Sequence, residues 1–233
     1  MRAKKTQGEV TYDRIEKSGC GGGGQVGRII TSDACVREGA AWLADQDPRF
    51  AAAIDLCGPL PLRRKPEGFG ELLSAIVSQQ VSVASANAIW GRMVEAGLDT
   101  APQVAAASEE ELRSVGLSRQ KIRYAHALAA AGIDFDALRQ LPDAEVIATL
   151  TQVSGIGTWT AEIYAMFSLG RADVFAHGDL ALQEGARILL DLPERPKPAA
   201  MRRIAEAWSP WRSVAARVLW AYYRVAKDRE GIR

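Results

Sequence analysis

The chain has 233 residues, of which 48% are hydrophobic, enough for one substantial core or for two helical lobes around a cleft. No stretch approaches about 20 uninterrupted apolar residues and no signal-type apolar segment follows the basic start, so we expect an intracellular protein, cytoplasmic or in a eukaryote nuclear, without membrane contact. The net charge of +1 does not by itself indicate a nucleic-acid partner, because affinity for duplex DNA comes largely from neutralised phosphates.

The first predicted region, residues 1–32, is a flexible N-terminal extension, because it is polar and contains the run Gly-Cys-Gly-Gly-Gly-Gly. Helices are predicted from there on by apolar spacing near 3.6 residues and by capping residues. In chain order they cover residues 33 to 43, 50 to 56, 69 to 95, 108 to 115, 118 to 131, 143 to 152, 158 to 169, 179 to 190 and 198 to 228. No run alternates with a period of two over a useful length. The sequence therefore predicts an all-α protein.

The helices at 143 to 152 and 158 to 169 are joined by a Gly-x-Gly turn. Gly155 and Gly157 can adopt positive φ and let another chain approach the backbone closely. The free N–H groups at the start of the next helix, at Thr158, Trp159 and Thr160, attract anions. Most Gly-x-Gly turns merely join helices, so the turn alone is weak evidence for phosphate binding.

Asp179 follows the second of these helices and precedes another apolar run. Its position is typical of an N-cap residue, whose side chain accepts a hydrogen bond from the next helical turn. A catalytic role is compatible with that, since a helix N-terminus favours a negatively charged side chain.

Four ordered segments resemble one known family. They are Ala75-Ile76-Val77-Ser78-Gln79-Gln80-Val81-Ser82, Gly116-Leu117-Ser118-Arg119-Gln120-Lys121, the turn from Val153 to Ala161 followed by Asp173-Val174-Phe175 and Asp179, and Trp208-Ser209-Pro210-Trp211-Arg212-Ser213 with Leu219-Trp220. Together they resemble the helix-hairpin-helix (HhH-GPD) DNA glycosylase superfamily, and within it the 3-methyladenine DNA glycosylase II group. The resemblance covers roughly residues 35 to 225.

The resemblance implies an architecture of two helical lobes that flank a cleft for DNA and a flipped base. The central lobe would be residues 69–170, with the helix-hairpin-helix motif at 143–169. Residues 33–68 and 171–233 would form the other, discontinuous lobe. The N-terminal β domain of larger relatives is expected to be absent, because too few residues precede the matched region.

The resemblance also implies the chemistry. Asp179 would be the catalytic residue of a DNA N-glycosylase that excises alkylated purines of the 3-methyladenine type and starts base excision repair. Bifunctional members carry an attacking lysine two residues after the second hairpin glycine, where this chain has Trp159. We therefore expect a monofunctional enzyme, in which water attacks C1′ and an abasic site is left.

Aromatic side chains are expected to hold the cationic base, with Trp159 and Trp220 as the candidates by family position. Cation–π attraction contributes about 0.5 to 2 kcal/mol in such pockets. The alternative is ordinary packing, since Trp208, Trp211 and Trp220 fall in one predicted C-terminal helical region. The family's aromatic pocket residue is replaced by Ile163, which leaves the identity of the excised base open.

By resemblance, Gln80 would enter the duplex through the minor groove as a wedge; the alternative is an ordinary hydrogen-bonded helix residue. Gln79 is expected to be structural. The phosphate-binding hairpin would comprise Gly155, Ile156, Gly157, Thr158 and Thr160. The resemblance further implies a structural Na⁺ or K⁺ ion on the backbone carbonyls of Thr151, Val153 and Gly155.

No other cofactor is expected. The three cysteines, Cys20, Cys35 and Cys57, are too few for a four-thiolate iron–sulfur cluster, and His126 and His177 lack partners at zinc spacing. The expected partner is double-stranded DNA that contains alkylated bases, bound by a monomer. Local cation groups would supply contacts to phosphate: Arg63-Arg64-Lys65, Arg119 with Lys121 and Arg123, and Arg202-Arg203 with Arg212.

Two other interpretations stay open. A non-catalytic helix-hairpin-helix module that recognises damaged DNA would bind without releasing a base, and would be favoured by an Asp179 outside any cleft. An all-α scaffold with no DNA role would suit the near-neutral charge, but it leaves the hairpin glycines and the downstream aspartate unexplained.

Overall fold

The computed structural model describes residues 26–229, and in them the only β structure is an isolated bridge between Ile29 and Arg171. The prediction of an all-α protein is confirmed for this part of the chain. The part of the predicted extension at residues 1–25 lies outside the described residues. No helix that the structure describes has the length and apolar character to cross a bilayer.

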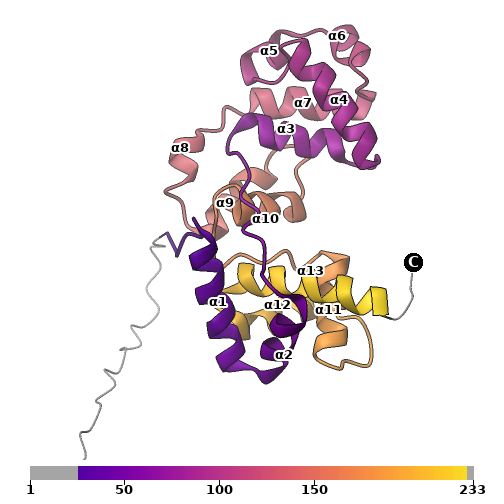
Figure 1. Cartoon of the computed structure of the whole chain (residues 1–233). Helices are drawn as coiled ribbons and strands as arrows, with labels where there is room; N and C mark the ends of the chain where they lie inside the picture. Colours follow the sequence, from indigo (N-terminus) through magenta and orange to yellow (C-terminus); the bar gives the residue numbers. More distant parts are fainter. Residues whose placement is uncertain (1–25, 230–233) are drawn as a thin grey trace, which may run out of the picture.

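The first group of helices is formed by both ends of the described chain. Helix α13 packs against α1, α2 and α11 (Figure 1). Aromatic rings fill the space between them, with Trp208 lying 5.4 Å from the ring centroid of Phe50 and 5.5 Å from that of Phe175. The members of the group are α1 (Asp33–Gln46), α2 (Pro48–Cys57), α11 (Leu180–Leu189), α12 (Pro198–Ala205), the 3-10 helix η1 (Glu206–Trp208) and α13 (Arg212–Arg229).

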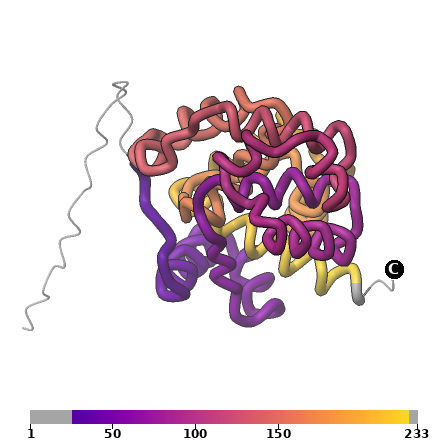
Figure 2. Tube along the Cα trace, turned by 90° about the horizontal axis from the view of Figure 1, so that it is seen from above, coloured from indigo at the N-terminus to yellow at the C-terminus, as the bar shows by residue number. Residues whose placement is uncertain are grey.

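The second group comes from the middle of the chain and lies over α13 when the molecule is seen from above (Figure 2). Helix α7 packs against α3, α5 and α6, and α10 packs against α9. The group consists of α3 (Phe69–Ser78), α4 (Val83–Glu95), α5 (Ala101–Ala106), α6 (Glu109–Ser114), α7 (Arg119–Ala130), α8 (Phe135–Leu138), α9 (Asp143–Thr151) and α10 (Thr158–Phe167).

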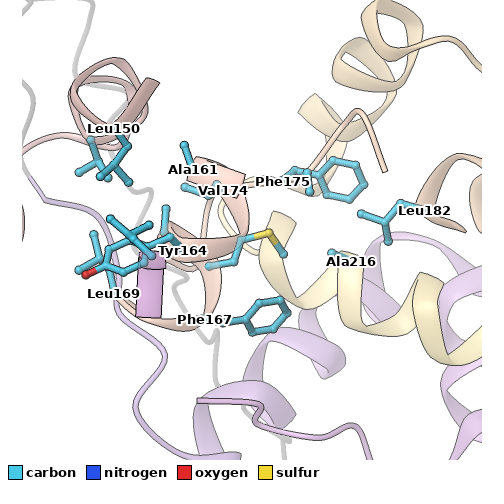
Figure 3. Packing of buried hydrophobic residues seen from close by; sticks show 14 of the residues in the cluster. Leu150, Ala161, Tyr164, Phe167, Leu169, Val174, Phe175, Leu182 and Ala216 are labelled. Atoms are coloured by element: carbon cyan, nitrogen blue, oxygen red, sulfur yellow. The ribbon is translucent and has the colours of Figure 1, made fainter. Parts of the chain in front are cut away.

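Helix α10 joins the two groups through its apolar side chains. Ala161, Tyr164 and Phe167 are buried, and Figure 3 shows them in one core with Leu150 of α9 and Ala216 of α13. Burial of a Phe or Leu side chain contributes about 1.5–3 kcal/mol. The segment that carries the glycine turn is thus held by packing against both groups.

Two predicted helices are interrupted in the structure. The predicted helix over 69 to 95 is wrong in its middle, because α3 ends at Ser78 and the Ser82 hydroxyl caps α4 by accepting from the N–H of Ser85. The predicted helix over 198 to 228 is likewise broken after η1, where Pro210 has no N–H to continue it. The short helices α5 and α8 were not predicted, since six and four residues are too few for a helical period to emerge.

Candidate active site

Asp179 lies at the N-cap of α11 and accepts three hydrogen bonds. Its Oδ1 accepts from the backbone N–H of Leu182 at 3.0 Å and from Nε1 of Trp220 at 3.2 Å, and its Oδ2 accepts from Nε1 of Trp159 at 3.0 Å. The capping role predicted for Asp179 is therefore present. The two indoles come from α10 and α13, so the carboxylate is oriented by side chains from both groups of helices.

A cavity of about 460 Å³ opens beside this carboxylate, within the range of about 300–1,000 Å³ typical of small-molecule sites. One wall is aromatic, with the ring centroids of Phe167 and Trp220 5.7 Å apart and their planes inclined by 32°. Three basic residues also line the cavity. The lining residues are Arg63, Arg64, Lys65, Trp159, Ile163, Phe167, Asp179 and Trp220.

The two glycines of the turn between α9 and α10 differ in backbone conformation and in surroundings. Gly155 has φ +96°, and a Cβ there would lie 2.7 Å from Cβ of Tyr124, so both backbone and packing require glycine. Gly157 has φ −86° at the N-cap of α10, and a Cβ there would meet nothing within 4 Å. The expectation that either glycine can use positive φ is realised only at Gly155.

The remaining hairpin residues divide between surface and interior. Thr158 is exposed, whereas Ile156 and Thr160 are buried. The first helical hydrogen bond of α10 runs from the N–H of Ala161 to the carbonyl of Gly157 at 3.0 Å. The N–H groups of Thr158, Trp159 and Thr160 precede that ladder, as an anion site at a helix N-terminus requires.

Two of the three backbone carbonyls predicted to hold a monovalent cation already accept hydrogen bonds. The carbonyl of Val153 accepts from the N–H of Ile156 at 3.0 Å, and that of Gly155 accepts from Nε2 of Gln79 at 2.9 Å. Each oxygen has a second lone pair, so these contacts are compatible with a cation. Its binding stays a prediction. Among residues 26–229, no three His, Cys, Asp or Glu side chains are grouped to hold a metal.

Gln80 lies in the turn between α3 and α4, exposed and with φ +58°. The alternative that it is an ordinary helix residue is wrong, because α3 ends before it and α4 begins after it. A left-handed conformation costs a residue other than glycine about 1–3 kcal/mol. The adjacent Gln79 ties this turn to the hairpin through its bond to Gly155.

Residues 73–210 match the model of the HhH-GPD superfamily base excision DNA repair proteins. The Schizosaccharomyces pombe protein named DNA-3-methyladenine glycosylase 1 is 31% identical over 203 residues, which cover 82% of this chain and 89% of that protein. This chain belongs to the HhH-GPD superfamily.

Solved structures agree with this assignment. A DNA-3-methyladenine glycosidase from Bacillus halodurans is 34% identical, with a TM-score of 0.74 over 87% of this chain and 94% of that one. The Schizosaccharomyces pombe 3-methyladenine DNA glycosylase in complex with abasic DNA is 32% identical, with a TM-score of 0.68 over 78% of this chain and 95% of that one. The predicted membership of the DNA glycosylase superfamily is confirmed.

The tryptophans of this HhH-GPD protein divide between core and cavity. Trp208 and Trp211 are buried, so the packing interpretation is right for them. Trp159 is 49% exposed and Trp220 is half-buried, and both line the cavity beside Asp179. Because α12, η1 and α13 are separate elements, the placement of Trp208, Trp211 and Trp220 on one helical region is wrong.

Several of the predicted phosphate-binding cations have internal partners. Lys121 is buried and donates to the carbonyl of Val77 at 2.6 Å, which excludes it from the surface. Arg212 donates two hydrogen bonds to Asp173, at 2.7 and 2.9 Å. Arg63, Arg64 and Lys65 remain beside the cavity, and Arg119 and Arg123 are exposed.

A second polar cluster joins Glu162 of α10 to His177 and to Arg202 of α12, and sequence reasoning missed it. Nδ1 of His177 lies 2.7 Å from Oε1 of Glu162, and Nε2 of His177 lies 2.7 Å from Nη2 of Arg202. Because a guanidinium has only donors, Nε2 must accept, and the imidazole proton is therefore on Nδ1 and is donated to Glu162. Burial lowers the pKa of His177, which is consistent with this neutral ring.

Glu162 itself is buried, and no hydrogen-bond donor reaches its Oε2. Burial raises the pKa of Glu162 to about 8, while the nearby Arg202 acts in the opposite direction. No local sequence signal could have revealed the cluster, because its members are 15 and 25 residues apart.

Proposed function

We propose that this chain is a monofunctional DNA N-glycosylase that flips alkylated purines out of duplex DNA, excises them and leaves an abasic site. The observation that carries the proposal is the orientation of Asp179 by three N–H donors at the wall of an aromatic-lined cavity. The relatives named for 3-methyladenine support the choice of substrate class.

Asp179 would act on the sugar. Breaking the C1′–N bond leaves positive charge on the deoxyribose, and a fixed carboxylate stabilises that charge without having to reorient. The same carboxylate can orient the water that attacks C1′. Because Trp159 and Trp220 hold both carboxylate oxygens, the side chain cannot rotate away from the cavity without losing these bonds.

The aromatic wall would receive the base. An N3- or N7-alkylated purine carries positive charge before cleavage and leaves as a neutral base, so it needs no general acid. Stacking on Trp220 and Trp159 suits such a cation. This argument supports alkylated purines over bases that must be protonated to leave.

The absence of a strand-cleaving step is inferred from the amines near the cavity. Trp159 occupies the position of the family's attacking lysine. Lys65 also lines the cavity, but its Nζ lies 2.6 Å from Oε1 of Glu71, and an ammonium held by a carboxylate is a poor nucleophile. We therefore infer hydrolysis by water and no Schiff base.

The DNA would be held mainly through its backbone. The N-terminus of α10 offers N–H groups to a phosphate, and the open space at Gly157 lets the phosphate approach. Gln80, exposed on its turn, would fill the gap left by the flipped base. We propose a monomer that acts where genomic DNA lies, the bacterial cytoplasm or the eukaryotic nucleus.

The test is base release from methylated duplex DNA by the wild type and by Asp179→Asn. Asparagine keeps the N-cap, so the helix should persist. We expect the wild type to release 3-methyladenine and form abasic sites without strand breaks, and the variant to lose at least about 100-fold in rate. Binding of an abasic duplex by both proteins is the control for folding.

Binding without release from any alkylated duplex would contradict the enzymatic proposal. It would favour the non-catalytic recognition module, although Asp179 lies in a cavity rather than outside one. Strand cleavage by the wild type would contradict the monofunctional mechanism alone.

A further inference from the structure

The basic rim of the cavity is a short segment, residues 62–65, that is tied to the fold at both ends. The carbonyl of Leu62 accepts from Nη2 of the buried Arg217 at 2.9 Å. The N–H of Lys65 donates to the carbonyl of Phe167 at 3.0 Å. Between these ties Arg63 has φ +53°, a left-handed conformation that is costly for arginine. The surrounding structure therefore holds Arg63 in place despite the strain.

Arg63 differs from its neighbours in its partners. Arg64 pairs with Glu67 at 3.5 Å and Lys65 pairs with Glu71 at 2.6 Å. Among the side chains that the structure describes, which end at residue 227, no carboxylate forms a salt bridge with Arg63. Its guanidinium carbon lies 5.9 Å from the ring centroid of Trp220, in the cavity that contains Asp179.

The guanidinium of Arg63 is exposed at the cavity, and a second cation, Arg224, is near it. An arginine stays charged at neutral pH, so Arg63 is expected to gain from a ligand that brings acceptor atoms or negative charge.

The same cavity thus contains the carboxylate of Asp179 and the cation of Arg63. Cleavage of an N-glycosidic bond produces opposite charges on two fragments, positive on the sugar and negative on the base. When the C1′–N9 bond of an uncharged purine breaks, the electron pair leaves with the base. The sugar becomes positive, water adds to C1′ and gives up a proton, and the purine anion takes a proton from solvent. We propose that Arg63 is a specificity-determining residue, whose guanidinium stabilises the negative charge that an uncharged purine develops as it leaves.

The proposal rests on the proposed function and extends its substrate range. An alkylated, cationic purine becomes neutral on leaving, so it gains nothing from Arg63 and is repelled by it before cleavage. A purine with acceptor atoms at O6 and N7, such as the deaminated base hypoxanthine, gains two donors in an arrangement that arginine supplies well. The two substrate classes should therefore respond to Arg63 with opposite signs.

The competing role for Arg63 is a contact to a DNA phosphate. Such a contact would act equally on both substrates, and its loss would lower affinity for duplex DNA and flatten the salt dependence of binding. The ratio of the two excision rates separates the two roles.

The experiment measures single-turnover excision of hypoxanthine and of 7-methylguanine from otherwise identical duplexes, by the wild type and by Arg63→Met. Methionine retains much of the length of the side chain and removes its charge. We expect hypoxanthine excision to fall at least about tenfold, and 7-methylguanine excision to stay equal or rise. Arg64→Met is the matched control from the same rim, and should leave the ratio of the two rates within about threefold of the wild type. Thermal unfolding checks that both variants fold.

Each other outcome overturns the inference in a recognisable way. An equal fall on both substrates, with weaker duplex binding, assigns Arg63 to phosphate, and unchanged rates on both leave it without a catalytic effect. Wild-type release of 7-methylguanine without hypoxanthine release contradicts the inference while the proposed function stands. Release of no base from any duplex contradicts both.

Discussion

Two carboxylates, Asp179 at the N-cap of α11 and Glu162 on α10, have different surroundings. Asp179 faces an open cavity and accepts from three N–H donors. Glu162 is buried against His177 and Arg202, and one of its oxygens has no hydrogen-bond donor. The first arrangement presents negative charge to a ligand, whereas the second opposes ionisation and raises the pKa to about 8. The type of residue alone therefore does not identify the reactive carboxylate.

The two glycines in the turn before α10 also differ in their surroundings. A side chain at Gly155 would collide with Tyr124, whereas a side chain at Gly157 would point into open space. The first glycine is explained by the fold. No neighbour among the described residues explains why the second is a glycine. The open space beside it is what a site for an approaching DNA backbone requires.

The largest expected effect compares the two carboxylates directly. Replacing each carboxylate by its amide should lower the rate of base release strongly only at Asp179, because only Asp179 faces the cavity. We expect Glu162→Gln to keep base release within about threefold of the wild type, while Asp179→Asn loses at least about 100-fold. Single-turnover release of 3-methyladenine measures both. Comparable losses in the two variants would show that the enclosed carboxylate is part of the reaction machinery.

The two glycines provide the next test. Gly155→Ala combines a strained φ with a steric clash, and should cost about 2–3 kcal/mol in the free energy of unfolding. Gly157→Ala should leave that free energy within about 0.5 kcal/mol and lower the affinity for abasic duplex DNA several-fold. Urea unfolding and fluorescence anisotropy measure the two quantities. Unchanged DNA affinity in Gly157→Ala would remove the argument for a phosphate at this turn.

Removing one donor to Asp179 should have a smaller effect. Trp159→Phe keeps an aromatic ring and loses the hydrogen bond from Nε1. Hydrogen bonds to charged groups contribute about 1.5–3 kcal/mol, and two donors remain, so we expect about a tenfold loss in single-turnover rate. Trp211→Phe, in the buried core, is the control for loss of an indole. An unaffected rate in Trp159→Phe would show that the other two donors suffice to orient the carboxylate.

The smallest expected effect is a pH dependence of thermal stability that comes from the buried Glu162. Because the pKa of Glu162 is raised from 4.5 to about 8 in the folded state, the associated stability is fully present below pH 4.5 and is lost as the pH rises toward 8. Glutamine cannot ionise, so Glu162→Gln escapes this loss. The Tm of the variant relative to the wild type should rise by several degrees between pH 5 and pH 9. Differential scanning calorimetry at both pH values measures it, and a constant difference would contradict the raised pKa.

Local patterns in the sequence determined the helical class, the turn between α9 and α10, and the capping position of Asp179. Each of these depends on residues within a few positions of one another, such as Gly155 and Gly157 or Asp179 and Leu182. The same local reasoning failed where a short break interrupts an apolar pattern. At Gln80 and at Pro210, a turn of a few residues divides what reads as one helix.

The tertiary structure decided which of these residues meet. Trp159 and Trp220 are 61 residues apart, yet both donate to Asp179. Arg63 belongs to a basic run that the sequence assigns only to phosphate contact, whereas the structure ties the segment at Leu62 and Lys65 and places Arg63 over Trp220. Packing of helices that are distant in the chain produces these contacts, and no periodicity or spacing records them. The sequence therefore determined most of the helices and the candidate carboxylate, and the fold decided which charged groups surround that carboxylate.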